Sequence, residues 1–253
     1  MLSNSLIEKI SRDLNNSKRV VAFTGAGISA ESGIPTYRGK GGFWTKYDPD
    51  KYASIDYFEK DPSYYWSFFK ESRKPILENA KPNPAHYSLA ELEKREKLRC
   101  VITQNIDGMH QQAGSKNVIE LHGTTRNFRC KRCEKFYTLE EIGELLKVEL
   151  PPLCKECKGI IRPNVIFFGE MLPQDALRRA ISEAENCDFM MAIGSSLVVY
   201  PAAQIPLIAK DKGAILLIIN VEPTGLDLSA DYVINEKAGK VLPEIVEHLN
   251  SIS

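Results

Sequence analysis

The sequence has no long apolar run, no excess of either charge and no internal repeat. Its 253 residues contain 33 Lys and Arg against 33 Asp and Glu, so the formal net charge is zero. This balance excludes a chain-wide attraction to nucleic acid or to an anionic membrane, and we expect no direct nucleic-acid binding. No stretch approaches the roughly 18 apolar residues of a membrane span, and segment 1–19, which we expect to be helical, lacks the apolar core of a signal peptide. The absence of targeting signals predicts a cytoplasmic protein.

The six cysteines are few and unevenly placed. Four of them form two Cys-x-x-Cys pairs, Cys130 with Cys133 and Cys154 with Cys157. In a reducing compartment this spacing indicates metal or redox chemistry rather than disulfide bonds. Four thiolates in two knuckles suit tetrahedral Zn²⁺, while two unrelated thiol pairs or an iron–sulfur site are the alternatives. Because sulfur would fill all four positions, such a zinc ion would be structural and would hold together an insert too small for its own core.

Apolar runs of strand length alternate with helical segments along most of the chain. We predict strands over residues 19–24, 98–103, 118–121, 165–168, 188–194, 214–220 and 231–234. Strands that alternate with helices favour an α/β fold, with a Rossmann-like parallel sheet covered by helices on both faces.

Two stretches do not follow this alternation. Residues 39–81 are rich in aromatic residues, Gly and Pro, and residues 127–162 hold the paired cysteines. We interpret them as insertions that together build a small domain, a helical insert plus the four-cysteine module. The Rossmann-type domain would then comprise residues 1–38, 82–126 and 163–253.

A glycine-rich turn follows the first predicted strand. Gly25–Ala30 reads G-x-G-x-x-A, a pattern that lets backbone N–H groups approach a pyrophosphate, although such glycines also serve plain turns. The continuation does not suit a dehydrogenase, because Gly33–Pro35 stops the helix and the acids Asp48 and Asp50 lie in a loop. Glu222, just past a later strand, is the better ribose ligand. The pattern therefore favours a bound dinucleotide without hydride transfer.

Polar residues follow three other predicted strands. Ligands of open α/β sheets bind at the carboxyl ends of strands. His122 stands at such an end, which favours a catalytic role, although a structural histidine is the alternative. The segment Thr103–Asp107 also follows a strand, and its side chains either converge on a ligand or cap a helix. Gly194–Ser196 binds phosphate or ribose, or forms a plain turn.

Together these motifs resemble the sirtuin family over residues 20–243, nearly the whole chain. The resemblance rests on the order and spacing of Gly25–Ser29, Ser32–Pro35 with Arg38, Gln104–Asp107, Leu121–Gly123, the cysteine quartet, Phe168–Glu170, Gly194–Leu197, Asn220 and Lys237–Gly239. It implies a prokaryotic-type minimal catalytic core that acts as an NAD-dependent protein-lysine deacetylase or deacylase. NAD would be a co-substrate, and one structural Zn²⁺ would be present.

The resemblance also implies roles for individual residues. The catalytic residues would be His122, Asn105 and Asp107. NAD would contact Gly25, Ala26, Gly27, Ser29, Glu31, Tyr37, Arg38, Gln104, Asn105, Ile106, Asp107, Gly194, Ser195, Ser196, Asn220, Val221, Glu222 and Ala238. An acetylated-lysine protein or peptide, with an acetylated chromatin protein as one candidate, would pair as an added strand with Val165, Phe167, Phe168, Gly169, Glu170, Val198 and Tyr200.

The implied reaction transfers the acyl group to ADP-ribose, so the enzyme would be a transferase. Asn105 and Asp107 would hold nicotinamide while it leaves, the acyl oxygen would attack the ribose carbon, and His122 would then act as general base on a ribose hydroxyl. The products would be nicotinamide, O-acyl-ADP-ribose and free lysine. Protein mono-ADP-ribosylation and non-catalytic binding of NAD or ADP-ribose are the alternatives.

Two departures from the family pattern bear on the substrate. Thr36-Tyr37-Arg38 replaces the common Asp-Phe-Arg, which keeps an aromatic ring but loses a carboxylate. Members that remove succinyl or malonyl groups carry a Tyr and an Arg one helical turn apart. Phe69 and Ser72 occupy the matching positions here, next to Arg73, which favours acetyl or an apolar acyl group. With no added coiled coil, we expect a monomer.

Overall fold

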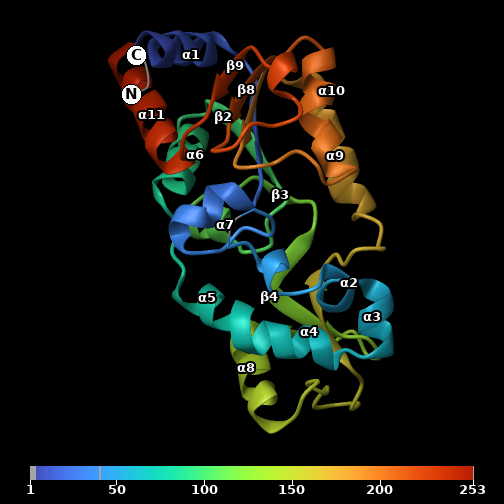
Figure 1. Cartoon of the computed structure of the whole chain (residues 1–253). Coiled ribbons are helices and arrows are strands. Elements are labelled where there is room, and N and C mark those ends of the chain that lie inside the picture. Colours follow the sequence, from blue (N-terminus) through green and yellow to red (C-terminus); the bar gives the residue numbers. More distant parts are fainter. Residues whose placement is uncertain (1–3, 40, 253) are drawn as a thin grey trace.

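The computed structural model describes residues 4–39 and 41–252, so the predicted N-terminal helix 1–19 lies partly outside the described residues. Its larger part is a six-stranded parallel sheet in the order β3-β2-β1-β7-β8-β9 (Figure 1). The strands are β1 (Val20–Thr24), β2 (Leu98–Thr103), β3 (Val118–Glu120), β7 (Phe189–Ile193), β8 (Ile215–Ile219) and β9 (Tyr232–Ile234). Six of the seven predicted strands and the predicted fold class are thus confirmed.

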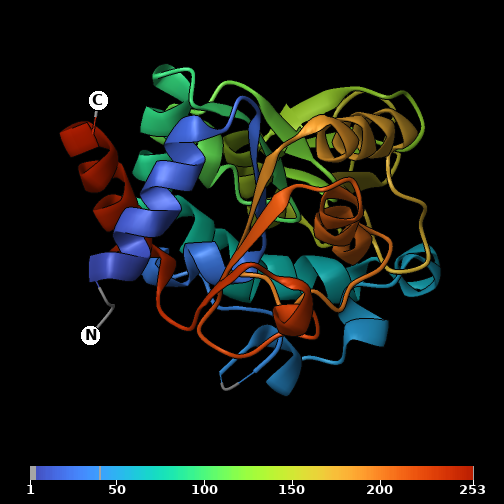
Figure 2. The same ribbon diagram turned by 90° about the horizontal axis from the view of Figure 1, so that it is seen from above.

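Helices cover both faces of this sheet because successive strand residues point to opposite sides. Along β1, Ala22 packs into a core with α1 (Asn4–Asn16), α6 (Pro84–Lys94) and α11 (Ala238–Ile252). Phe23, its neighbour, packs into the opposite core with α9 (Gln174–Asn186) and α10 (Ile205–Asp211). Figure 2 shows the two sets of helices on opposite sides of the sheet. Burial on both faces explains why these strands are almost entirely apolar.

The strand order reverses between β1 and β7. From β1 the chain runs outward through β2 and β3, and it returns to start β7 on the other side of β1. The loops that follow β1 and β7 therefore leave the sheet side by side, which opens a crevice at their carboxyl ends. The shorter elements are the 3₁₀ helices η1 (Ala26–Ser32), η2 (Phe43–Thr45), η4 (Ala202–Gln204) and η5 (Asp227–Ser229), and helix α7 (Met109–Ala113).

A smaller module lies below the sheet in Figure 1. It contains the three-stranded antiparallel sheet β5-β4-β6 and an aromatic core that includes Phe58, Trp66 and Phe128. Its elements are α2 (Pro49–Tyr52), α3 (Ile55–Lys60), α4 (Ser63–Phe68), α5 (Lys74–Asn79), β4 (Gly123–Cys130), β5 (Phe136–Thr138), α8 (Leu139–Val148) and β6 (Ile161–Val165). Strand β4 begins before the predicted segment 127–162, and strand β6 ends after it. The domain boundaries themselves stay a prediction.

The predicted strand 165–168 is wrong. The strand in this region is β6, which ends at Val165 and pairs antiparallel with β4 in the small sheet. Beyond it, Phe168 forms only an isolated bridge with Ser54. A short apolar run does not reveal what buries it, and here Phe167 packs into the small-module core rather than into the parallel sheet.

The aromatic segment 62–77, part of the predicted helical insert 39–81, is largely helical, but it contains an irregular turn. Between α4 and α5 lies one π-helical turn, η3 (Phe69–Arg73). A π turn holds more residues than an α turn, so it rotates the side chains that follow it relative to a regular helix. Among the described residues, no helix is both long and apolar enough to cross a membrane.

Candidate active site

A cavity of about 720 Å³ lies between the carboxyl ends of the parallel strands and the small module. Gly25 follows β1, Gln104 follows β2, Gly194 follows β7 and Asn220 follows β8, and all four residues line it. From the small module it is lined by aromatic residues, including Trp44, Tyr65 and Phe68. Its size and mixed lining suit a dinucleotide together with part of a second substrate.

Most residues predicted to bind NAD lie at this cavity. Those that line it are Gly25, Ala26, Gly27, Tyr37, Arg38, Gln104, Asn105, Ile106, Gly194, Ser195, Ser196, Asn220, Val221 and Glu222, together with His122. Ser29 and Asp107 line a pocket of about 30 Å³ that also involves Ala26, Asn105 and Ile106. Glu31 and Ala238 line neither space, and Glu31 instead accepts a hydrogen bond at 2.8 Å from the N–H of Gly239, at the start of α11.

The glycine turn after β1 packs directly on the turn after β7. The N–H of Gly27 donates to the carbonyl of Gly194 at 2.7 Å. A Cβ on Gly27 would lie 2.7 Å from the same oxygen, and a Cβ on Gly25 would lie 2.8 Å from the Cβ of Ser195. Any larger residue would therefore push the two turns apart. The glycines bring two strand ends together at the crevice, in the position that a pyrophosphate-binding turn takes.

His122 stands where the parallel sheet passes into the small module. Its Nδ1 lies 2.9 Å from the carbonyl of Gln104, which can only accept, so Nδ1 carries the proton and Nε2 is left as an acceptor. Burial lowers the pKa of His122, although the bond to Gln104 partly opposes this, so the ring is neutral at neutral pH. The next residue, Gly123, has φ +73°, and a Cβ there would collide with the carbonyl of Asn164. His122 is thus held in the form that accepts a proton.

A second polar cluster surrounds Asp107. Its carboxylate accepts hydrogen bonds from the hydroxyl of Ser29 at 2.8 Å and from the N–H of Met109 at 3.0 Å. Burial raises the pKa of Asp107, and these hydrogen bonds oppose the rise. The amide of Asn105 donates to the carbonyl of Gly25 and to the Ser29 hydroxyl, each at 3.1 Å. The glycine turn therefore holds Asn105 and Asp107 in place before any ligand binds.

Most of the predicted peptide-binding residues line the cavity. Val165, Phe167, Phe168, Gly169, Glu170 and Tyr200 line it, whereas Val198 does not. Sequence reasoning missed several further lining residues: Thr36, Trp44, Tyr52, Ala53, Tyr65, Phe68, Arg73, Met171, Leu172, Gln174, Leu177 and Pro201. The aromatic-rich segment 62–77 was the signal that could have located some of them.

The predicted register of the acyl-binding helix is wrong. Phe69 is fully buried and packs on Trp66 and Phe128 in the small-module core, and the Ser72 hydroxyl contacts Tyr47. The π turn instead brings Arg73 to the cavity. An Nη of Arg73 donates to the hydroxyl of Tyr37 at 2.6 Å.

Arg73 and Tyr65 keep unused hydrogen-bonding capacity at the cavity. Both residues line it, and Tyr65 is almost fully buried. Within the described part of the chain, Nε of Arg73 and the hydroxyl of Tyr65 are buried without a hydrogen-bond partner. The charge of Arg73 acts on the carboxylate of Asp107 and helps to lower its pKa. Buried polar groups are normally paired, so unpaired ones at a cavity indicate a partner that arrives with the ligand.

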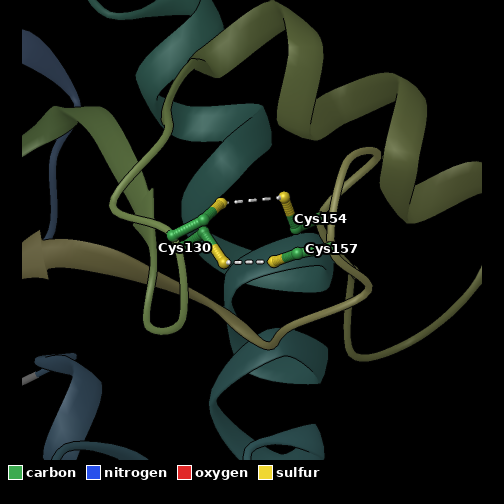
Figure 3. A group of neighbouring side chains, drawn as sticks. Cys130, Cys154 and Cys157 are labelled. Carbon is green, nitrogen blue, oxygen red and sulfur yellow. Dashed lines mark hydrogen bonds between the residues drawn. The ribbon is translucent and has the colours of Figure 1, made fainter.

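The four paired cysteines come together at one end of the small module. Their sulfurs lie within 4.8 Å of one another, with Cys130 and Cys157 at 3.4 Å and Cys133 and Cys154 at 3.6 Å (Figure 3). Tetrahedral Zn²⁺ with Zn–S bonds of about 2.3 Å separates its sulfurs by roughly 3.8 Å, so the donor set fits zinc. None of the four lines the cavity. The cluster is therefore a structural site, as predicted.

Comparison with known proteins places the chain among relatives of similar length. A family model described as the Sir2 family matches residues 25–201. The chain is 49% identical to an NAD-dependent protein deacylase of Pyrococcus furiosus, over 98% of this chain and 100% of that one. A solved structure of a Sir2 protein with a p53 peptide and NAD⁺ superposes with a TM-score of 0.90 at 44% identity, covering 98% and 99% of the two chains. Another, with a deacetylated p53 peptide and 3′-O-acetyl ADP ribose, gives 0.92 at 45% identity, covering 95% and 97%.

Proposed function

The chain belongs to the Sir2 family and is an NAD-dependent protein deacylase, and we propose that NAD and an acyl-lysine react in the cavity described above. The observation that carries this proposal is the position of His122. A neutral imidazole with a free acceptor nitrogen lines the same cavity as the glycine turn, Asn105 and Asn220. A general base and a dinucleotide-binding turn therefore share one space.

The polar residues at the cavity then bind NAD or take part in the reaction. NAD supplies a ribose carbon that carries nicotinamide, a good leaving group. Asn105 and Asp107 hold the nicotinamide amide, the turn at Gly25 holds the pyrophosphate, and Glu222 binds a ribose hydroxyl. The acyl oxygen attacks the ribose carbon as nicotinamide leaves. His122 then takes a proton from a neighbouring ribose hydroxyl, and the freed oxygen attacks the acyl carbon. The bond from that carbon to the lysine nitrogen breaks, the lysine leaves as the free amine, and one water molecule is consumed to give O-acyl-ADP-ribose.

The substrate is an acyl-lysine within an extended peptide. Exposed apolar side chains border the cavity on two loops, with Phe168 and Met171 on one and Tyr200 on the other. A peptide laid between these loops as an added strand would cover them and direct its acyl-lysine inward. Two related solved structures are complexes with p53 peptides, which supports a peptide as the substrate. An acetylated chromatin protein is one substrate of this kind, and we propose that the monomer acts on it without contacting nucleic acid.

A stoichiometric assay tests this function. Purified protein is incubated with an acetyl-lysine peptide, with and without NAD carrying a label in its adenylate part. We expect one nicotinamide released for each peptide deacylated, and no deacylation without NAD. Nicotinamide release with an unchanged peptide and label retained on protein would instead indicate mono-ADP-ribosylation. Binding of NAD without any nicotinamide release would indicate a non-catalytic binder.

The pH dependence of the reaction follows from the burial of His122. The base must be neutral, and burial lowers its pKa below the ordinary 6.5, so protonation requires more acidic solution. We expect kcat/KM to be flat around neutral pH and to decline with a midpoint below 6.5. A midpoint at or above 7 would show that His122 is not the titrating base.

Arg73 brings a positive charge with an unpaired Nε to the part of the cavity lined by Tyr65 and Phe68. Arg73 stacks on Phe68, with its guanidinium carbon 5.4 Å from the ring centre, and Tyr65 offers an unpaired hydroxyl at the same cavity. A carboxylate at the end of an acyl chain would pair with both groups. We therefore replace the initial expectation of an apolar acyl group, and propose that the pocket accepts succinyl as well as acetyl.

The role of Arg73 is tested with two peptides of the same sequence, one carrying succinyl-lysine and the other acetyl-lysine. In Arg73→Met the ratio of succinyl to acetyl kcat/KM should fall about tenfold to a hundredfold, the value of a charged hydrogen bond. Lys70→Met is the matched control, because Lys70 is a cation of the same π turn that does not line the cavity. An unchanged ratio in Arg73→Met, or no succinyl removal by the native chain, would contradict the proposal.

A further inference from the structure

Glu170 lines the cavity and was expected to contact the peptide, but both oxygens of its carboxylate are bonded within the protein. One oxygen accepts from Nη1 of Arg162 at 2.8 Å. The other accepts from Nη2 of Arg162 at 2.8 Å and from the N–H of Phe167 at 2.9 Å. Burial would raise the pKa of Glu170, yet these bonds outweigh it and hold the pKa below its usual value. The carboxylate is therefore charged and has little capacity left for a ligand.

Arg162 holds the same segment at two further points. Its Nη2 also donates to the carbonyl of Val165 at 3.0 Å, and its guanidinium lies 5.3 Å from the ring centre of Phe167. The side chains of Arg162 and Glu170 are only 10% and 21% exposed. A two-pronged ion pair with this little solvent exposure fixes geometry far better than a surface pair does.

The backbone of the segment is anchored on both flanks. Ile166 donates to the carbonyl of His122 at 2.9 Å. Phe168 donates to the carbonyl of Ala53 at 2.8 Å and accepts from the N–H of Ile55 at 3.0 Å. A turn over residues 167–170 begins between these anchors and continues past the second, and it is closed by the N–H of Glu170 donating to the carbonyl of Phe167 at 3.1 Å. The Arg162–Glu170 pair lies at this turn.

We infer that Arg162 and Glu170 are positioning residues: their ion pair holds segment 165–170 in the shape that the substrate peptide recognises, without touching the substrate. This inference rests on the proposed function. A preformed edge lowers the ordering cost of binding, so breaking the pair should weaken peptide binding. The dinucleotide side of the cavity is built by other loops and should be unaffected.

A double-mutant cycle tests the pair. Glu170→Gln keeps the shape of the side chain but removes its charge, and Arg162→Lys keeps the charge but removes the two-pronged geometry. The dissociation constant of a fluorescent acetyl-lysine peptide is measured by anisotropy, and that of ADP-ribose by calorimetry. Each single variant should bind the peptide about tenfold more weakly. The double variant should be no weaker than the worse single variant. ADP-ribose binding should not change.

Other results would overturn the inference. If Glu170 contacted the peptide itself, Arg162→Lys would bind normally, or the two effects would add. If the pair only supported folding, ADP-ribose affinity would fall together with peptide affinity. Glu134→Gln is the matched control, since it removes the Arg129–Glu134 ion pair of the same module, which does not line the cavity. Failure of the native chain to bind peptide would refute the proposed function itself, whereas equal binding by native and variant chains would refute only the pair's role.

Discussion

His122→Ala is expected to lower deacylation of an acetyl-lysine peptide by roughly 10²–10⁴-fold, the usual contribution of a general base. The ring is held by the carbonyl of Gln104, so its acceptor nitrogen is already oriented and neutral before substrate binds. Alanine removes the base without disturbing the neighbouring backbone, where the carbonyl of His122 still accepts from Ile166. The loss should therefore fall on kcat, with little change in the KM for NAD.

The control for this variant is His248→Ala. His248 lies in the terminal helix α11 and does not line the cavity. The control should retain full activity. Activity within tenfold of the native value in His122→Ala would mean that another group, or water, takes the proton. Initial rates with peptide and NAD both saturating are sufficient to decide.

We expect Cys133→Ser to lose the zinc ion and, with it, the folded structure of the small module. Cys133 is exposed, so serine changes little packing and the effect reports the lost ligand. The module has only a small core of its own, and small metal domains depend on metal binding for folding. We expect a fall from about one zinc ion per chain to a small fraction of one, together with loss of deacylation, because Arg73 and segment 165–170 belong to this region.

Tryptophan fluorescence can follow this change selectively. The chain has two tryptophans: Trp44 lines the cavity, and Trp66 lies in the core of the small module. Trp66 is fully buried, and its indole donates to the carbonyl of Ile161 at 3.2 Å. Its emission should shift to longer wavelength in Cys133→Ser. Cys187→Ala, a buried cysteine outside the cluster, should keep both zinc and emission. Full activity without zinc would contradict a structural role for the metal.

The parts of the fold that depend on local pattern were predictable from the sequence. Fully buried strands such as β7 are continuous apolar runs, and the cysteine spacing alone was enough to predict the metal cluster. Gly25 and His122 could be placed at strand ends because parallel sheets bind ligands there. These predictions needed only the spacing of apolar residues along the chain and the position of each motif relative to the strands.

The errors arose where packing decides the geometry. Segment 165–168 is as apolar as a core strand, but its partner is the small module, which a short run does not reveal. Arg73 reaches the cavity because a π turn interrupts the helix, and no residue type signals such a turn. Glu170 lines the cavity as a predicted peptide residue, but its ion pair with Arg162, eight residues earlier, was not predicted. In each case the outcome depended on a partner that sequence spacing does not identify.

The central claim is that His122 acts after nicotinamide has left, within the same cavity. Peptide-dependent exchange of labelled nicotinamide into NAD reports the earlier step alone, and deacylation reports both. In His122→Ala the account predicts that exchange persists while deacylation is lost. Loss of both to the same extent, in a variant that still binds ADP-ribose and peptide, would contradict it and place His122 in the departure of nicotinamide instead.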